Sequence, residues 1–404
     1  MDVNNANIRA PKSAQEIEHD ILGVLFPTPF ACAKLTALPQ GTTNFVFRGT
    51  LTEPVPVSSD EDHAVSEKIE TVIVKHVEKH TRLNPALRLD SLDGFEPSIL
   101  SHLRQFRWEE SSGSTSSAKS SSGQLGGHVR VPHVLFAGQD TFVVEDFGQD
   151  TKDMAAWLLG PEPELRHKAK SVGQWLKAFH RWAIEPSQEK LVARLAENSA
   201  MGEFRIDIMY RGISAVCEKL GLLDGDTITA FKEVEALILH EFAERDPGKA
   251  TGEEWGPIHS DFWTGNVLVP TPEGSGRRPY FSVIDWEFAH LGFRAYDLGH
   301  MTGDLIEKHQ LGRLDGFTAA FGGFVEGYSN ISRDMAFRTL IHAGAQLICW
   351  YFRGPKKGLH DDEIRRIIKL GRDMICYGIK RDEYWFRDNG FGPIISTPHV
   401  EQQL

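Results

Sequence analysis

The sequence predicts an α+β protein with two lobes, a small β-rich lobe followed by a larger helical one. Three observations favour this plan. Strand-like segments dominate up to Gly148, apolar residues at helical spacing dominate after it, and one strand-rich island from Ile258 to Phe288 interrupts the helices. A chain of 404 residues also exceeds what one small core would hold. We therefore expect an N-terminal lobe over residues 1–146 and a C-terminal lobe over residues 147–404.

The N-terminal lobe is expected to begin with a helix and to contain five strands. Ser13 and Glu16 form a capping-box pair ahead of an apolar helical pattern. The segments CAKLTAL and NFVFRGTL flank Pro-Gln-Gly-Thr-Thr and predict two strands joined by a turn. A polar loop from about residue 53 to 67 precedes TVIVKHV, a strand apolar enough to be buried. Helical spacing follows from Phe95 to Phe106, and the segments HVLFAG and TFVVEDF give the last two strands.

Residues 109–127, EESSGSTSSAKSSSGQLGG, interrupt this lobe. The segment has almost no apolar side chains, so burial cannot offset the entropy lost on ordering it. Strand-like segments resume directly after it, and we interpret it as a disordered surface insertion within the lobe.

The C-terminal lobe is predicted to be mainly helical. Leu165, Val172, Trp175, Phe179 and Trp182 mark one face of an amphipathic helix. Further helices are expected around residues 203–222, 226–245, 315–328, 333–352 and 361–380. No internal repeat is visible.

Composition excludes several classes of protein. A net charge of -12 argues against nucleic acid or an anionic membrane as the main partner, because both favour a basic surface. The four cysteines are scattered without metal-ligand spacing, and we expect reduced structural thiols. The chain shows no signal-peptide pattern and no apolar run approaching the roughly 18 residues of a membrane span. These features predict a cytoplasmic protein; the oligomeric state stays open.

The strand-rich island carries the chemistry. His259-x-Asp261 is followed by Asn266 and an apolar strand, and Asp285 closes the next strand, YFSVID. Transfer of a phosphoryl group needs a carboxylate that accepts the proton of the attacking hydroxyl, and oxygen ligands for the metal on the phosphates. Asp261 fits the first role, and Asn266 and Asp285 fit the second. Each residue alone would be an ordinary turn or cap residue; the combination predicts a phosphotransferase.

The N-terminal lobe offers matching nucleotide contacts. Lys75 stands within the apolar strand TVIVKHV, where a phosphate partner explains a buried charge, although an edge-strand lysine is the alternative. Glu96 could anchor Lys75 through an ion pair, or serve only as an acid in the first turn of its helix. The remaining candidate residues for nucleotide binding are the turn residues Gly41, Thr42, Thr43 and Asn44 and the segment between the lobes, Glu145, Asp146 and Phe147.

With these motifs the chain resembles the aminoglycoside phosphotransferase and choline kinase superfamily, which has a bilobal protein-kinase-like fold. It is most similar to the branch that contains methylthioribose kinase and the fungal 4-hydroxytryptamine kinase. The segments LPQGTTNFVFRG, TVIVKHV, FVVEDFG, IHSDFWTGNVLV and VIDWEFAHLGFRAYDLGHMTGD carry the resemblance, which extends from about Leu35 to Gly378.

The resemblance implies ATP and Mg²⁺ as cofactors and assigns roles by position. Asp261 would be the catalytic base, and Asn266 and Asp285 would bind magnesium. Glu287, in the variant motif Asp-Trp-Glu, would be a further metal ligand or a nearby solvated carboxylate. Lys75 would contact the nucleotide phosphates, with Glu96 as its anchor. The remaining roles are structural: His259 would orient the catalytic loop and Asp297 would brace it.

Two departures favour a small-molecule acceptor. Ser260 replaces the arginine of the protein-kinase triplet, and no Ala-Pro-Glu segment follows Asp285. The acceptor should carry a hydroxyl, on a hydroxylated amine, an aromatic metabolite or a sugar. Trp350 and Arg353 could wall its pocket, although aromatic residues at helical spacing more often form core. A nucleotide-binding pseudokinase without turnover is the alternative function.

Overall fold

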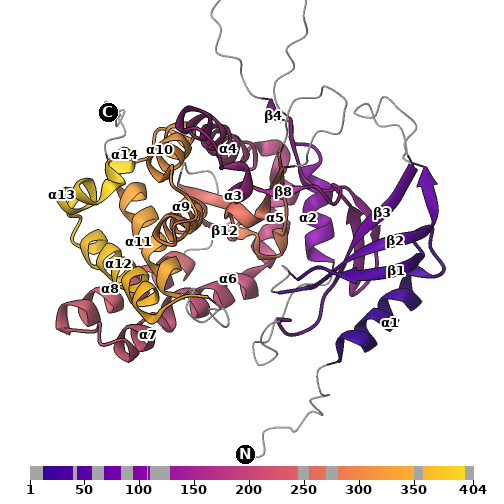
Figure 1. Ribbon diagram of the computed structural model, residues 1–404, viewed down its shortest axis with the longest axis horizontal. Coiled ribbons are helices and arrows are strands. Elements are labelled where there is room, and N and C mark those ends of the chain that lie inside the picture. Colours follow the sequence, from indigo (N-terminus) through magenta and orange to yellow (C-terminus); the bar gives the residue numbers. More distant parts are fainter. Residues whose placement is uncertain are drawn as a thin grey trace, which may run out of the picture. The chain divides into compact units, whose positions relative to one another are not determined.

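The computed structural model describes residues 12–39, 43–56, 68–82, 94–106, 108–109, 128–243, 254–269, 281–349 and 358–395. The chain forms two compact units, one comprising residues 1–101 and 132–148 and the other residues 102–131 and 149–404. The first is built on an antiparallel sheet and the second is mostly helical (Figure 1), so the predicted α+β class is confirmed. The described residues of the segment 102–131, which the sequence predicts in the N-terminal lobe, lie in the helical unit.

The sheet of the N-terminal unit has the strand order β1-β2-β3-β7-β6, with all neighbours antiparallel. Its strands are β1 (Cys32–Ala37), β2 (Phe45–Pro56), β3 (Lys68–His76), β6 (Val134–Ala137) and β7 (Thr141–Glu145). These are the five strands predicted from the sequence. The predicted loop begins too early, because β2 continues to Pro56 and Val55 still pairs with Ile69 of β3.

One face of this sheet packs against α1 (Ala14–Leu25), which starts with the predicted capping box between Ser13 and Glu16. Ile17 and Ile21 of α1 form a core cluster with Val72 and Val74 of β3. Side chains alternate along a strand, so Lys75 points to the opposite face. The alternation explains how a strand that looks continuously apolar can present one buried cation.

The C-terminal unit is dominated by helices, and its longest ones match the predicted segments. The helices are α3 (Met154–Trp157), α4 (Glu162–Trp182), α5 (Glu189–Glu197), α6 (Ser199–Ile206), α7 (Ile213–Lys219), α8 (Gly225–Ala243), α9 (Ala295–Gln310), α10 (Phe317–Tyr328), α11 (Arg333–Cys349), α12 (Asp361–Ile379), α13 (Glu383–Phe386) and α14 (Gly392–Ile395). A π-helical turn, Asp207–Arg211, joins α6 to α7. The predicted segment 203–222 therefore contains two helices and a turn. None of the described helices is both long and apolar enough to cross a bilayer.

Helix α9 was not predicted from the sequence, although it carries Asp297. It is buried along almost its whole length and includes buried His300, Asp304 and Glu307. The amphipathic pattern that reveals a surface helix needs a polar solvent face, which a fully enclosed helix lacks.

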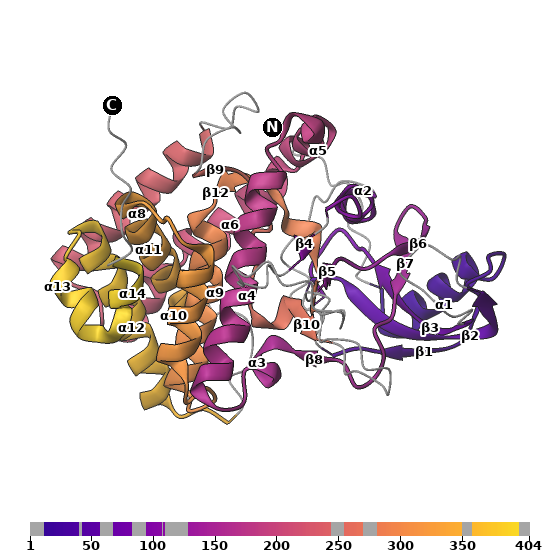
Figure 2. The same ribbon diagram turned by 90° about the horizontal axis from the view of Figure 1, so that it is seen from above.

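Helices α4 and α10 lie side by side (Figures 1 and 2) and approach closely because glycines line the contact. A Cβ added to Gly323 would stand 2.2 Å from the backbone oxygen of Arg166, and one added to Gly173 would stand 2.2 Å from that of Phe324. Only glycine fits at these positions without separating the two helices.

Short strands in this unit position the candidate site. The sheet order is β4-β5-β11-β10-β8, with β4 (Trp108–Glu109), β5 (His128–Arg130), β8 (Lys152–Asp153), β10 (Val267–Val269) and β11 (Phe281–Val283). A separate pair joins β9 (Trp255–Ile258) to β12 (His290–Phe293). Strands β4 and β5 were not predicted and pair with each other on either side of the serine-rich segment. From residue 110 onwards that segment lies outside the described residues.

Candidate active site

The catalytic loop predicted from the sequence begins where β9 ends, at Ile258, and leads through a 3-10 turn, Thr264–Asn266, into β10. His259 fixes the start of this loop. Its Nδ1 accepts a hydrogen bond from the Asp261 amide at 3.2 Å, so its Nε2 carries the proton and donates to the carbonyl of Ile284 at 2.8 Å. The imidazole thus ties the loop to the residue after β11.

Asp297, at the start of α9, fixes the same loop through hydrogen bonds to its backbone. Its fully buried carboxylate accepts hydrogen bonds from the amides of His259 at 2.9 Å and Ser260 at 2.7 Å. It also accepts one from His180 Nε2 of α4 at 3.0 Å. Ser260 has a φ of 67°, a left-handed conformation that costs a non-glycine residue energy. The hydrogen bonds that the two backbone amides donate to Asp297 stabilise this turn.

The Asp297–His180 pair consists of an anion and a neutral imidazole. Burial raises the pKa of the Asp297 carboxyl, but the hydrogen bonds from His180 and from the His259 amide, with the electrostatic effect of the two imidazoles, outweigh burial and leave the pKa below its usual value. Burial lowers the pKa of His180 from 6.5 to about 4. His180 Nε2 faces the Asp297 carboxylate, which can only accept, so the imidazole proton lies on Nε2 and the Tyr328 hydroxyl donates to Nδ1 at 2.9 Å.

Asp261 is partly exposed, with 18% of its side chain accessible, and its carboxylate is oriented by several donors. Asn266 Nδ2 donates to its Oδ2 and to its backbone oxygen, both at 2.9 Å, and Trp263 Nε1 donates to Oδ2 at 3.3 Å. An Arg205 nitrogen lies 3.2 Å from Oδ1. The carboxylate is held in place and is still reachable, as a group that receives a proton from a substrate must be.

Asn266 and Asp285 are brought together by the β10–β11 pairing. Val267 stands opposite Val283, and the Ile284 amide donates to the carbonyl of Asn266 at 3.0 Å, so Asn266 precedes one strand where Asp285 follows the other. Asp285 has a φ of 62°, in the left-handed region. The pairing gives the proximity that the sequence predicted for two short polar side chains at adjacent strand ends.

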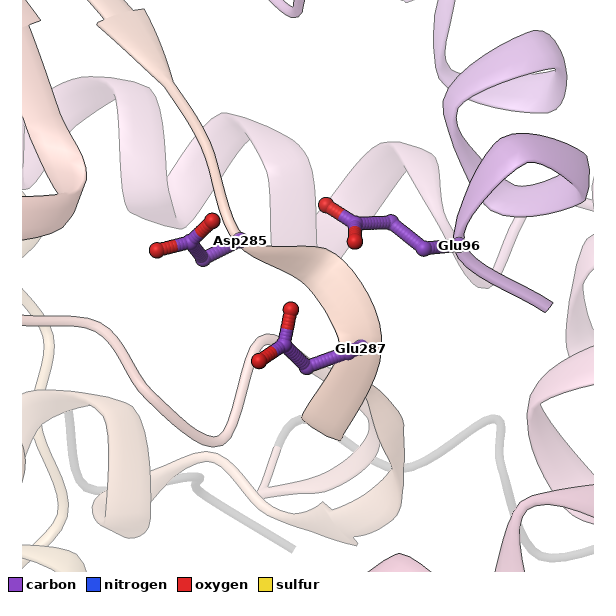
Figure 3. Close-up of side chains that lie close together, drawn as sticks. All are labelled: Glu96, Asp285 and Glu287. Atoms are coloured by element: carbon purple, nitrogen blue, oxygen red, sulfur yellow. The ribbon is translucent and has the colours of Figure 1, made fainter. Parts of the chain in front are cut away.

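Glu287 extends this group of oxygen atoms. It lies in the 3-10 turn Trp286–Phe288, and carboxylate oxygens of Asp285 and Glu287 lie within 4.8 Å of each other (Figure 3). Asn198 fixes the turn, because its Nδ2 donates to the carbonyls of Glu287 at 3.0 Å and Ala289 at 2.9 Å. Two carboxylates at this spacing can share one cation.

The N-terminal unit contains a buried ion pair at the predicted position. Lys75 Nζ lies 2.7 Å and 2.9 Å from the two carboxylate oxygens of Glu96 at the start of α2 (Phe95–Leu103). Asn44, one of the candidate turn residues, is also buried. Arg48 binds the Asp146 carboxylate through two nitrogens, at 2.6 Å and 3.0 Å. The Asp146 side chain is therefore part of an ion pair within the N-terminal unit. Four other candidate residues lie outside the described part of the chain: Gly41, Thr42, Trp350 and Arg353.

Comparison with protein-family models identifies the domain around the catalytic loop. Residues 152–333 match the model of the phosphotransferase enzyme family. The chain therefore contains a phosphotransferase family domain. This match includes Asp261, Asn266 and Asp285, and it confirms the resemblance to a phosphotransferase family predicted from the sequence.

Curated relatives are phosphotransferases as well. The chain is 25% identical over 392 residues to phosphotransferase FrzJ of Cladobotryum sp., covering 93% of this chain and 95% of the relative. It is 22% identical over 240 residues to the 4-hydroxytryptamine kinase of Psilocybe cyanescens, covering 57% of this chain and 62% of that protein. The prediction that the chain is an enzyme of the phosphotransferase class is confirmed.

Solved structures similar to this phosphotransferase include spectinomycin phosphotransferase in complex with ADP and spectinomycin. That match has 13% identity and a TM-score of 0.45, covering 92% of this chain and 99% of the other. The Plasmodium vivax ethanolamine kinase matches with 12% identity and a TM-score of 0.42, covering 90% of this chain and 82% of the other.

The candidate site also contains residues that the sequence did not reveal. Arg205 of α6 donates to the Ser260 carbonyl at 2.6 Å and lies 2.7 Å from His300 Nδ1 of α9. Asp304 of α9 accepts a hydrogen bond from the Thr264 hydroxyl at 2.5 Å. These partners are 40 to 95 residues apart along the chain, and no local spacing connects them to the catalytic motif.

The oxygen atoms at the ends of β10 and β11 fit the magnesium ion implied by the family. Mg²⁺ prefers carboxylate and other hard oxygen ligands, which Asp285 and Glu287 supply. The Asn266 Nδ2 group is committed to Asp261, so the amide oxygen is the atom that this side chain can offer a cation. The donor set therefore suits a hard divalent cation bound through oxygen.

Proposed function

We propose that the protein is an ATP- and Mg²⁺-dependent kinase that transfers the γ-phosphate to a hydroxyl group of a small molecule. The observation that carries the proposal is the arrangement around Asp261, a partly exposed carboxylate oriented by Asn266, next to two further carboxylates in the loop after β11. A bound magnesium ion would neutralise the phosphate charge, with Asn266, Asp285 and Glu287 as its protein ligands.

In the proposed reaction Asp261 orients the acceptor hydroxyl and takes its proton. The hydroxyl oxygen forms the new bond to the γ-phosphorus, the bond from that phosphorus to the β–γ bridging oxygen breaks, and ADP leaves. Asn266 and Trp263 keep the carboxylate in one orientation, so that little reorganisation precedes the proton transfer. His259 and Asp297 hold the backbone on which Asp261 stands.

The N-terminal unit supplies the proposed nucleotide contacts. Lys75, held by Glu96, would bind the phosphates, and the backbone of residues 145–147 would meet the adenine. Arg48 binds the Asp146 side chain and the Glu145 amide donates to the His133 carbonyl at 2.9 Å, so this segment is held in one conformation. Thr43 and Asn44 remain candidates for phosphate contact. A hydroxyl acceptor of small size agrees with Ser260 in the catalytic triplet and with relatives named as kinases of 4-hydroxytryptamine.

The proposal is tested by Asp261→Asn with Mg-ATP and a panel of hydroxylated amines, sugars and aromatic alcohols. We expect ADP release from the unmodified protein with at least one acceptor, and a loss of turnover of about 10³-fold or more in the variant, because proton transfer contributes roughly 10²–10⁴ to such rates. ATP binding, measured by calorimetry, should stay nearly unchanged. Asp315→Asn, at an exposed position after α9, is the matched control.

Turnover that survives in Asp261→Asn would contradict the role of this residue. An equal loss of ATP binding and turnover would mean that Asp261 binds nucleotide and is not the base. If ATP binds to the unmodified protein but no acceptor increases ADP release, the chain is a nucleotide-binding module and the kinase proposal fails.

A further inference from the structure

Helix α9 presents one row of polar side chains to the catalytic loop, within the C-terminal unit. Asp297, His300 and Asp304 are three and four residues apart, a spacing that places side chains on the same face of a helix. Asp297 binds the first two backbone amides of the loop, and Asp304 binds the amide and the hydroxyl of Thr264. Between these two contacts, His300 Nε2 lies 3.6 Å from Oδ1 of Asp261. His300 is therefore the member of the row that lies next to the proposed catalytic base.

The hydrogen-bond partner of His300 determines which ring nitrogen carries the proton. Nη2 of Arg205 lies 2.7 Å from His300 Nδ1, and a guanidinium group can only donate, so Nδ1 is the acceptor. A proton on Nδ1 would bring two donors together at this distance inside a fully buried site. The imidazole is therefore neutral, with its proton on Nε2, and this N–H faces Oδ1 of Asp261.

Arg205 is itself held in place by its surroundings. It is 8% exposed, its guanidinium lies 5.2 Å from the ring centroid of Phe288, and the same Nη2 donates to the Ser260 carbonyl at 2.6 Å. Nη2 carries two hydrogens, and the Ser260 oxygen and the His300 nitrogen both lie closer to it than Asp261 does. Oδ1 of Asp261, at 3.2 Å, therefore receives mainly the positive charge of Arg205.

The two oxygens of the Asp261 carboxylate thus have separate sets of partners. Oδ2 accepts from two side chains of the loop itself, Asn266 and Trp263. Oδ1 faces the His300 N–H and the charge of Arg205. Rotation about the last bond of an aspartate side chain is soft, so partners on one oxygen alone restrict the carboxylate plane less than partners on both. The second set of partners therefore has a purpose in a group that must receive a proton from one direction.

We propose that Arg205 and His300 form a positioning pair for the Asp261 carboxylate. Arg205 holds the His300 proton on Nε2, and this N–H together with the Arg205 charge sets the plane in which the carboxylate meets the acceptor hydroxyl. Both residues act through Asp261. The inference rests on the proposed kinase function and adds one requirement to it, an N–H donor at the position of His300 Nε2.

The test replaces His300 by leucine, which has no N–H, and by glutamine, whose amide nitrogen can take the place of Nε2. Rates are measured with Mg-ATP and the alcohol of the acceptor panel that gives the fastest ADP release. In His300→Leu, kcat should fall about tenfold or more, because a misplaced catalytic group can cost up to roughly a hundredfold. In His300→Gln, kcat should stay within about threefold of the unmodified protein. KM for ATP should change little in either variant, and His240→Leu, at an exposed position on α8, is the control.

A double variant tests whether the two residues act as one unit. Arg205→Met removes both the donor to His300 Nδ1 and the charge beside Asp261. We expect Arg205→Met/His300→Leu to be no slower than Arg205→Met alone, because residues that act through one network show non-additive losses. Losses in kcat that multiply in the double variant would mean two independent residues and would overturn the pair.

Nitrogen NMR reads the tautomer of His300 in the unmodified protein and needs no turnover. In 15N spectra of protein labelled at its 17 histidines, ring nitrogens that carry a proton are distinguished from those that do not. The signals of His300 are those that disappear in His300→Gln. At pH 7 we expect a protonated Nε2 and an unprotonated Nδ1, and a proton on Nδ1 would overturn the proposal.

The results separate this inference from the kinase proposal. If His300→Leu keeps the full kcat, or if the leucine and glutamine variants lose equally, the positioning role is wrong while the unmodified protein still releases ADP with its acceptor. Equal losses would assign His300 to packing alone. If no acceptor increases ADP release from the unmodified protein, the kinase function fails and the positioning role fails with it, whichever tautomer NMR shows.

Discussion

Replacing Asp297 by asparagine removes one oxygen acceptor from the buried support of the catalytic loop while keeping the size of the side chain. In the native protein Oδ2 accepts from the His259 amide and from His180, and Oδ1 accepts from the Ser260 amide. Asparagine can keep its oxygen at the first position, but its NH₂ group then faces the Ser260 N–H. One hydrogen bond becomes a contact between two donors, and the other two lose the charge that strengthens them.

The expected loss of stability is about 2–4 kcal/mol. A hydrogen bond to a charged group contributes roughly 1.5–3 kcal/mol, and the Ser260 N–H becomes buried without an acceptor. The loss stays below that of a broken ion pair because His180 is neutral at pH 7, with a pKa of about 4, so no uncompensated charge remains. Ser260 also keeps a strained φ of 67° with one support fewer, so Asp261 should be less well placed.

Urea unfolding at pH 7, followed by far-ultraviolet circular dichroism, measures this loss as a lower midpoint with an unchanged slope. The same substitution at exposed Asp315 controls for the removal of one negative charge. An Asp297→Asn variant that unfolds within about 0.5 kcal/mol of the unmodified protein would refute the reasoning. Activity gives a second readout: kcat should fall while KM for ATP changes little, because the support acts on the catalytic loop.

Three further changes follow from the same geometry. The folded-state pKa of His180 is depressed, so the unfolded chain binds a proton at higher pH than the native protein does. The free energy of unfolding should therefore fall by about 3 kcal/mol as the pH drops from 6.5 to 4. A His180→Gln variant whose stability depends on pH as steeply as that of the unmodified protein would contradict this. Glu287→Gln should raise the magnesium concentration at half-maximal rate about tenfold, whereas Glu218→Gln, at an exposed position on α7, should not change it. Equal magnesium titrations of the two variants would remove Glu287 from the metal site. Gly323→Ala should destabilise the protein by more than about 2 kcal/mol, because its methyl group meets the backbone of Arg166 on α4. A variant that unfolds thermally at the same midpoint temperature as the unmodified protein would disprove this close contact.

Much of the fold was predictable because the relevant signals are local. The capping box at Ser13, the five strands of the N-terminal sheet and the longest amphipathic helices are all encoded in short stretches of sequence. The predictions failed where local signals were weak. Strands β4 and β5 are only two and three residues long, and α9 has no solvent face to give it an amphipathic pattern.

The sequence by itself determined which chemistry the chain carries, because Asp261, Asn266 and Asp285 stand at fixed spacings around two short strands that pair with each other. Only the tertiary structure decided what surrounds them. Arg205, His180 and Asn198 reach the loops from α6, α4 and the end of α5, and no periodicity links residues that are so far apart in the chain. The aromatic side chains packed near Ser260, among them Tyr210, Trp255 and Tyr296, likewise come from separate elements, the π-helical turn, β9 and α9. Their arrangement exists only once these elements have packed, because no local spacing in the sequence brings them together.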